Sequence, residues 1–121
     1  MKFKNLFVIF FAFFSGCAAR LSTLEFSKSF NQFIALIYQR IKGKIDGPLY
    51  GHCWNGWHAS GYVASITLKQ FCGYTDQQAL DYWIKNTDGD NNYEKIKQKV
   101  KSWKPLEKYK ISSSESALIC P

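Results

Sequence analysis

The segment GHCWNGWH, residues 51–58, holds the side chains of this sequence that could do covalent chemistry. Cys53 followed by Trp54 at a helix start has the order of a nucleophilic cysteine segment, and such a thiol needs a histidine to take its proton. The only two histidines are His52 and His58. On a helix, His58 would be rotated about 140° from Cys53, so its ring could not face the sulfur. The sequence therefore predicts that this protein is not an enzyme.

Two candidate metal sites fail on ligand spacing. The first is a zinc set made of His52, Cys53, His58 and Cys72. It lacks the short Cys-x-x-Cys or His-x-x-x-His spacing that zinc sites use. The second is a calcium loop starting at Asp88, which would place Tyr93 where the loop needs glycine and Lys99 where it needs a bidentate glutamate. We expect no metal ion and no other cofactor.

The helices that must position these residues are indicated by apolar spacing and by capping patterns. Residues 22–25 read Ser-Thr-Leu-Glu, a capping box, and an apolar stripe with spacings of three and four follows. The second segment also alternates like a strand, but we favour a helix. The predicted helices cover 23–42, 52–67, 75–86, and a last stretch from a cap at Asn91 to Pro105, whose buried face is Tyr93, Ile96, Val100 and Trp103. The expected fold is mainly α, a small single-domain bundle of about four helices stapled by a disulfide.

The chain begins with a pattern typical of a secretory signal peptide. Lys2 and Lys4 precede a stretch from Leu6 to Ala19 that holds no charged residue, which is the layout of a charged region followed by an apolar one. The stretch is shorter than the roughly 20 residues that a membrane-spanning helix needs. We therefore expect export across the inner membrane rather than a permanent span.

Two cleavage sites compete at the end of this stretch. The sequence Phe-Ser-Gly-Cys at residues 14–17 resembles a bacterial lipobox, in which the cysteine becomes the first mature residue and carries acyl chains. The small residues that follow also suit cleavage by an ordinary signal peptidase near Ala19. We favour lipidation of Cys17, and several acyl chains would anchor the protein stably. The predicted organisation is a signal peptide over 1–17 and one helical domain over 18–121, in the periplasm or anchored to the outer membrane.

The mature chain would keep three cysteines, which in an oxidising compartment favour one disulfide and one further thiol. A helix over 52–67 would put Cys53 about 20 Å from the helix end. The few residues before Cys72 reach at most about 17 Å back, whereas a disulfide needs Cα atoms within about 7 Å. Cys120 is therefore the expected partner of Cys53 or of Cys72, and the remaining thiol could make a homodimer.

Two surfaces could bind a partner. Seven of the residues between Lys95 and Lys110 are lysines and one is acidic; the predicted basic face is Lys95, Lys97, Lys99, Lys101 and Lys104. Such a face is either a solvated helix surface or a contact for an anionic partner. The aromatic candidates are Trp54, Trp57, His58 and Tyr62, which would either pack in the core or anchor a partner protein. No nucleic-acid-binding motif is present, and export argues against such a partner.

The order of several motifs resembles the Rap1a/Tai group of immunity proteins, which are small, helical and exported, and which protect bacteria from type VI secretion effectors. The motifs are CWNGWHASGY, FCGYTDQQALDYWIK and the terminal ALICP, with matches at Cys53, Gly56, Phe71, Cys72, Thr75, Gln78 and Cys120. The chain departs from the group where Gly-Tyr replaces Ile-Pro after Phe71-Cys72, and in its lysine-rich helix. The resemblance implies binding rather than catalysis.

The sequence therefore predicts an exported, lipid-anchored helical binding protein that occludes a toxic effector. In this interpretation aromatic residues in the 54–62 segment dock on the partner, and the lysines steer an acidic surface toward them. The alternative is a structural envelope lipoprotein whose lysine-rich helix contacts anionic lipid or polysaccharide.

Overall fold

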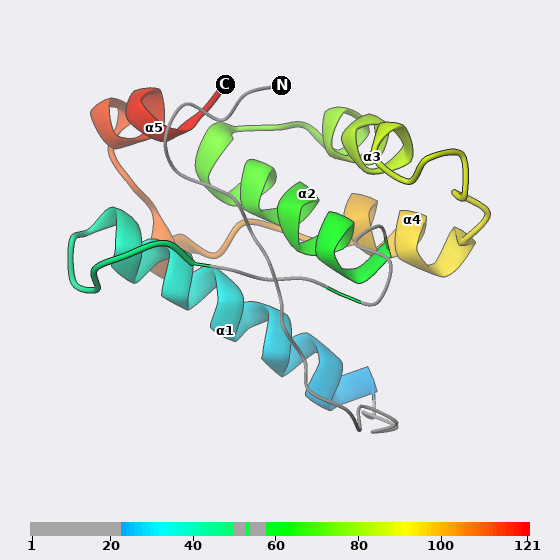
Figure 1. Ribbon diagram of the computed structural model, residues 1–121, viewed down its shortest axis with the longest axis horizontal. Coiled ribbons are helices and arrows are strands. Elements are labelled where there is room, and N and C mark those ends of the chain that lie inside the picture. The colour runs from blue at the N-terminus through cyan, green and yellow to red at the C-terminus, as the bar shows by residue number, and fades with distance from the viewer. Residues whose placement is uncertain (1–22, 50–52, 54–57) are drawn as a thin grey trace.

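The computed structural model describes residues 23–49, 53 and 58–121, with side chains from Phe30 onward in these ranges. This part of the chain forms helices and no strand. The elements are α1 (Thr23–Ile41), α2 (His58–Cys72), α3 (Asp76–Lys85), α4 (Glu94–Ser102), the 3-10 helix η1 (Glu107–Tyr109) and α5 (Ser113–Ile119) (Figure 1). The predicted mainly α fold is confirmed, and so is a disulfide, which joins Cys72 to Cys120.

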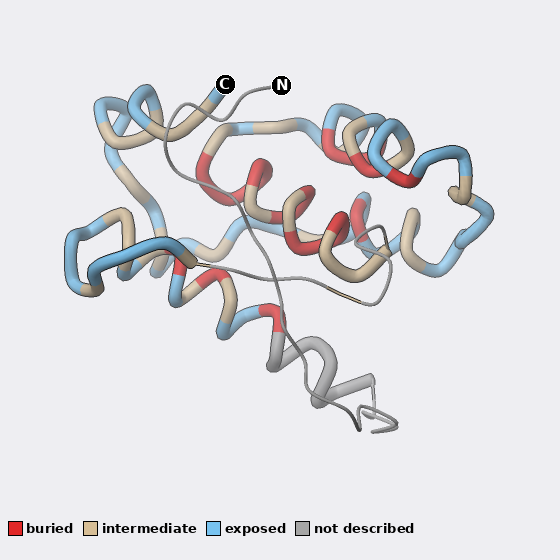
Figure 2. The backbone as a smooth tube through the Cα atoms, in the orientation of Figure 1, coloured by how far each residue is buried: buried red, intermediate tan, exposed pale blue. Residues whose placement is uncertain are grey.

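The central helix of the described fold is α2. It contacts α1, α3, α4 and α5, and in Figure 1 it lies between α1 and α3. Its buried residues include the apolar Ile66 and Phe71 and the polar Ser65, Lys69 and Gln70, and Figure 2 shows buried backbone along most of its length. A helix that is covered on several sides has no single apolar stripe. This explains why the segment fits helical and strand patterns equally well in the sequence.

The predicted end of this helix at residue 67 is wrong. Helix α2 continues to Cys72, because the residues after 67 are buried and find hydrogen-bond partners in the C-terminal third of the chain. Gly73 then adopts the left-handed conformation, with φ at 66°, that ends a helix at low cost only for glycine. The predicted start near residue 52 is also wrong: Cys53, which the structure describes, lies in no helix, and α2 starts at His58.

Helix α1 has the predicted apolar stripe. Phe30, Ile34 and Ile37 are buried at spacings of three and four, and they pack with α2 residues in the core. The helix ends at Ile41, and Gly43 follows with a φ of 67°, which allows the N–H groups of Gly43 and Lys44 to reach back to the last turn's carbonyls. The Ser22 cap predicted at its start lies outside the described residues.

The capping box predicted at Thr75 is confirmed. The Thr75 hydroxyl accepts a hydrogen bond from the N–H of Gln78 at 3.2 Å, and the Gln78 amide oxygen accepts one from the N–H of Thr75 at 2.9 Å. A second capping box, at Ser112 and Glu115, opens α5. The prediction of about four helices did not include α5, although its Ser-x-x-Glu spacing is the same kind of signal.

The cap predicted for the last lysine-rich helix is wrong. Helix α4 starts after Tyr93 rather than Asn91, and the Tyr93 side chain makes no capping hydrogen bond. On this helix Val100 is buried and Ile96 is partly buried, as expected. Tyr93 is 41% exposed, so its assignment to the buried face is also wrong. Its position just outside the helix turns the ring away from the apolar stripe.

The core closes where α3 crosses the start of α2. Trp83 is 0% exposed, and its indole N–H donates to the carbonyl of His58 at 3.2 Å. Gly61 faces the same ring: a Cβ at this position would lie 3.2 Å from Cδ1 of Trp83 and 3.4 Å from its Nε1. The missing side chain of Gly61 therefore makes room for the largest residue of the core.

We expect Gly61→Ala to destabilise the protein by about 1 kcal/mol, even though alanine favours a helix over glycine by a similar amount. The reason is overpacking: the Trp83 ring is enclosed and hydrogen-bonded, so it cannot move away without losing a contact. Urea denaturation measures the change, with Ala64→Gly on the same helix as the control for helix propensity. A Gly61→Ala protein more stable than the parent would show that the ring shifts freely.

Candidate binding surface

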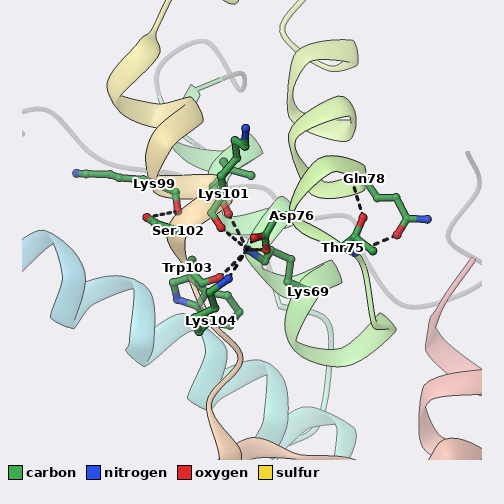
Figure 3. Close-up of polar contacts among 10 residues, drawn as sticks. Lys69, Thr75, Asp76, Gln78, Lys99, Lys101, Ser102, Trp103 and Lys104 are labelled. Carbon is green, nitrogen blue, oxygen red and sulfur yellow. Dashed lines mark hydrogen bonds and ion pairs between the residues drawn. The ribbon is translucent and has the colours of Figure 1, made fainter.

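A buried lysine fixes the lysine-rich helix to the core. Lys69 of α2 is 3% exposed, and its ammonium donates to the carbonyls of Val100 at 2.8 Å, Lys101 at 3.1 Å and Trp103 at 2.5 Å (Figure 3). These carbonyls lie at the C-terminal end of α4, where backbone acceptors lack helical partners and the helix dipole favours a positive charge. Lys69 therefore sets the position of α4 from its last turn.

Asp76, at the start of α3, completes this cluster. One carboxylate oxygen lies 2.8 Å from the ammonium of Lys69, and the other lies 3.1 Å from that of Lys104 (Figure 3). Hydrogen bonds from Lys69 first, and from Lys104 second, hold the pKa of Asp76 below its usual value of 3.8. The ends of α2, α3 and α4 are therefore joined by ionic contacts. Lys104, assigned to the basic face by its sequence position, is partly neutralised here.

The neighbouring residue, Gln70, fixes the segment after α4. Its side-chain NH2 donates to the carbonyls of Leu106 at 3.1 Å and Tyr109 at 3.2 Å, while its oxygen accepts from the N–H of Leu106 at 2.7 Å. Both the NH2 group and the oxygen of this amide thus hydrogen-bond to the backbone between Leu106 and Tyr109. Residues 100 to 109 are consequently held in place by two adjacent side chains of α2.

His58 is the predicted partner-binding residue that the structure places at a surface. Its Nε2 lies 3.0 Å from the carbonyl oxygen of Asp90 and 3.5 Å from a carboxylate oxygen of the same residue. Its ring contacts that of Tyr93 in a tilted arrangement, with centroids 4.0 Å apart, and lies 6.2 Å from that of Trp83. The imidazole therefore joins the start of α2 to the start of α4.

The other aromatic residues predicted to bind a partner are either in the core or outside the described residues. Tyr62 is 8% exposed and packs edge-on against Phe30, with ring centroids 4.8 Å apart, so it belongs to the core and does not present its ring to a partner. Burial raises the pKa of Tyr62 to about 12, which keeps the phenol neutral. Trp54 and Trp57 lie outside the described residues, as does Gly56.

The predicted basic face lies on two edges of α4. Lys95 and Lys99 are one helical turn apart on one edge, and Lys97 and Lys101 are one turn apart on the other, with the apolar stripe between them. Lys97 pairs with Glu94 at 2.8 Å. Within the described residues, Lys95 and Lys101 are exposed and form no ion pair. Two of the four α4 lysines, Lys95 and Lys101, therefore have no ion-pair partner among the described residues.

The disulfide settles which cysteine pairs with Cys120. Cys72 is the partner, with Cα atoms 5.6 Å apart, because α2 extends to Cys72 and brings it beside the C-terminus. The predicted exclusion of a Cys53 to Cys72 bridge is consistent with this bond. Cys53 lies instead with its sulfur 3.4 Å from the hydroxyl of Ser60. Cys17, the predicted lipidation site, lies outside the described residues.

Neither a metal centre nor a transmembrane helix is found in the part of the chain that the structure describes. No group of three or more His, Cys, Asp or Glu side chains there is arranged to hold a metal ion. None of the helices described is both long enough and apolar enough to cross a membrane.

Comparison with known proteins does not assign the chain to a class of proteins: no family model, no curated protein and no solved structure matches it.

The residues that define the candidate surface were only partly predictable from the sequence. Tyr93 was assigned to the core by helical spacing, and Asp90 carried no signal of its contact with His58 beyond its place in a polar turn.

Proposed function

We propose that this chain is an exported, lipid-anchored binding protein that inhibits a partner protein by covering an acidic surface on it. One observation carries the proposal: the rings of His58 and Tyr93 are in contact, with centroids 4.0 Å apart. This contact joins His58, one residue of the predicted aromatic segment, to the start of the lysine-rich helix α4, which supports a single surface that combines the two features. We call it the α4 surface, made of His58, Tyr93, Lys95 and Lys99, while Lys101 lies on the other edge of α4.

The chemistry of the α4 surface suits an acidic protein partner. Exposed lysines speed the encounter with a negatively charged surface, and an aromatic ring provides contact area that loses little entropy on binding. The ties from Lys69 hold α4 in position before any partner arrives, which lowers the cost of ordering it. The resemblance to the Rap1a/Tai group supports an immunity role, since the disulfide joins two of the cysteines that carry it.

Site-specific photo-cross-linking in cells tests the surface. A photoreactive phenylalanine replaces Tyr93, which is 41% exposed, or Leu36 on α1, which is 42% exposed and serves as the matched control. We expect a discrete protein adduct from position 93 and none from position 36, and the adduct should weaken when Lys95→Glu is added. Equal adducts from both positions would contradict the α4 surface.

The alternative function is a structural envelope lipoprotein whose lysines contact anionic lipid or polysaccharide. The exposed Lys95 and Lys101, with no ion pair in the described residues, favour it specifically. In that case position 93 gives lipid adducts rather than protein adducts. Binding to anionic vesicles would then disappear between low and moderate salt and in step with lysine removal.

Lipid anchoring is tested by the intact mass of the protein from a bacterial membrane fraction. We expect a mature chain that begins at Cys17 and carries acyl chains, and we expect Cys17→Ala to lose both the added mass and the membrane association. A soluble, unmodified chain that begins near Ala19 would remove the anchor from the proposal while leaving the α4 surface to be judged by cross-linking.

A further inference from the structure

Helix α5 stands outside the hydrophobic core. None of its residues is buried, and Leu118 is 80% exposed. Along the described chain, the last buried residue is Val100 in α4. The core cluster therefore consists of residues from α1 to α4, and α5 contributes only the partly buried Ile119 at its edge.

The contacts that attach α5 are few, and one is covalent. Its end is joined to α2 by the Cys72–Cys120 disulfide. Beyond this bond, Ile119 packs at the core edge and Ser116 Oγ donates to the Phe71 carbonyl, at 2.8 Å. Lys42 of α1 also pairs with Glu115 and donates to both of its carboxylate oxygens, at 2.7 and 2.9 Å. A single hydrogen bond and a solvent-accessible ion pair each contribute little net stability. The disulfide is therefore the dominant attachment.

The contacts among α1, α2, α3 and α4 do not depend on this bond. The polar ties that fix α4 and the following turn to α2 come from Lys69 and Gln70, and they end at Tyr109. The core packing ends earlier still. Loss of the disulfide would thus remove the attachment of α5 without removing any contact among α1, α2, α3 and α4.

Both sulfur-bearing residues are within reach of a reductant. Cys72 and Cys120 are each only partly buried, and thiol–disulfide exchange requires a thiolate to approach one of the two sulfurs. A seven-residue helix has too few hydrogen bonds to persist alone in water, even with its own capping box. Once detached, α5 would unwind.

We propose that the Cys72–Cys120 bond is a redox clasp, whose reduction by a dithiol releases α5 while α1 to α4 stay folded. One thiolate of the dithiol attacks a sulfur of the bond and forms a mixed disulfide, and the other cysteine leaves as a thiol. The second thiol of the reductant then displaces the first cysteine. The products are two protein thiols and a cyclic disulfide, so two electrons pass from the dithiol to the protein.

The clasp would make the attachment of α5 depend on the redox conditions of the compartment that holds the protein. In a reducing compartment the chain would have α5 detached, and after export to an oxidising one the bond would dock it. Docking also places Glu115 beside Lys42, where hydrogen bonds from Lys42 and from Ser112 lower the pKa of Glu115 to about 2. The ion pair therefore forms at any neutral pH, and oxidation alone decides the state.

Hydrogen exchange measured by mass spectrometry tests the clasp. The exported protein carrying Cys53→Ser, which prevents thiol exchange with a third cysteine, is compared before and after reduction by dithiothreitol and alkylation. We expect peptides covering Ser113–Ile119 to lose their protection completely. Peptides covering α2, α3 and α4 should keep theirs within a factor of about two, since their hydrogen bonds are unchanged.

Two further samples make the result decisive. Cys120→Ser in the same background should reproduce the reduced pattern without any reductant, whereas Ser116→Ala in the oxidised protein should keep α5 protected. Two results would overturn the clasp. One is α5 protection that survives reduction, which would mean that noncovalent contacts hold the helix. The other is loss of protection across α2 to α4, which would mean that the bond supports the whole domain.

Discussion

Lys69→Met will cost about 2–4 kcal/mol of unfolding free energy, a large fraction of the 5–15 kcal/mol typical of a small domain. Methionine has nearly the length of lysine and no charge, so it fills the space without making hydrogen bonds. The carbonyls of Val100, Lys101 and Trp103 then lose their common donor. The Val100 carbonyl is buried and the other two are partly so, and an acceptor that loses its partner away from water is costly.

The matched control is Lys104→Met, which removes the other ammonium on Asp76 but involves a side chain that is 71% exposed. We expect no measurable change in its urea midpoint, because exposed ion pairs contribute little. Equal effects of the two substitutions would mean that Asp76, not the α4 carbonyls, is the important partner of Lys69. Hydrogen exchange should also locate the Lys69→Met effect in α4.

Trp83→Ala is expected to cost about 3–5 kcal/mol, the largest effect of any single truncation proposed for this chain. The side chain is completely buried, packs on the backbone at Gly61 and donates to the His58 carbonyl. Removing it leaves a cavity where α3 meets α2, and the carbonyl loses a partner. Thermal and urea denaturation, measured together, report the loss.

Three comparisons separate the contributions at this site. Trp83→Phe keeps one six-membered ring but removes the N–H donor and part of the indole, so we expect about 2–3 kcal/mol, less than for Trp83→Ala. Trp103→Ala removes a tryptophan that is only partly buried and should cost less than Trp83→Ala. In the Trp83→Ala background, Gly61→Ala should become stabilising, because the new methyl group no longer meets an indole. If Gly61→Ala still destabilises the Trp83→Ala protein, the indole ring is not what excludes a side chain at position 61.

Local signals predicted the elements that depend on nearby residues. The stripe of Phe30, Ile34 and Ile37 and the capping box at Thr75 are each complete within a few residues, and both were found. The end of α2 was missed because Lys69 and Gln70 look like surface residues. Their partners lie 31 to 39 residues later, and only the folded chain brings them together.

The binding surface was predicted less well than the fold. Helical spacing placed Tyr93 with Ile96 on the buried face, but the helix begins one residue after Tyr93, so that spacing does not apply to it. The contact of His58 with Asp90 spans 32 residues and follows from the turn between α3 and α4. Trp54 and Trp57 stay predictions, since they lie outside the described residues.

The last turn of α2 also has a consequence for the order in which the chain folds. Its four residues find their partners in the same order as they occur: Lys69 at residues 100–103, Gln70 at 106–109, Phe71 at 116 and Cys72 at 120. Synthesis and export both deliver the chain from its N-terminus. Each partner therefore arrives only after the previous one, and closing the loop to Lys69 first shortens the remaining search for Gln70, Phe71 and Cys72. The covalent step comes last, so oxidation would dock α5 onto a domain that the hydrogen bonds of Lys69 and Gln70 have already selected.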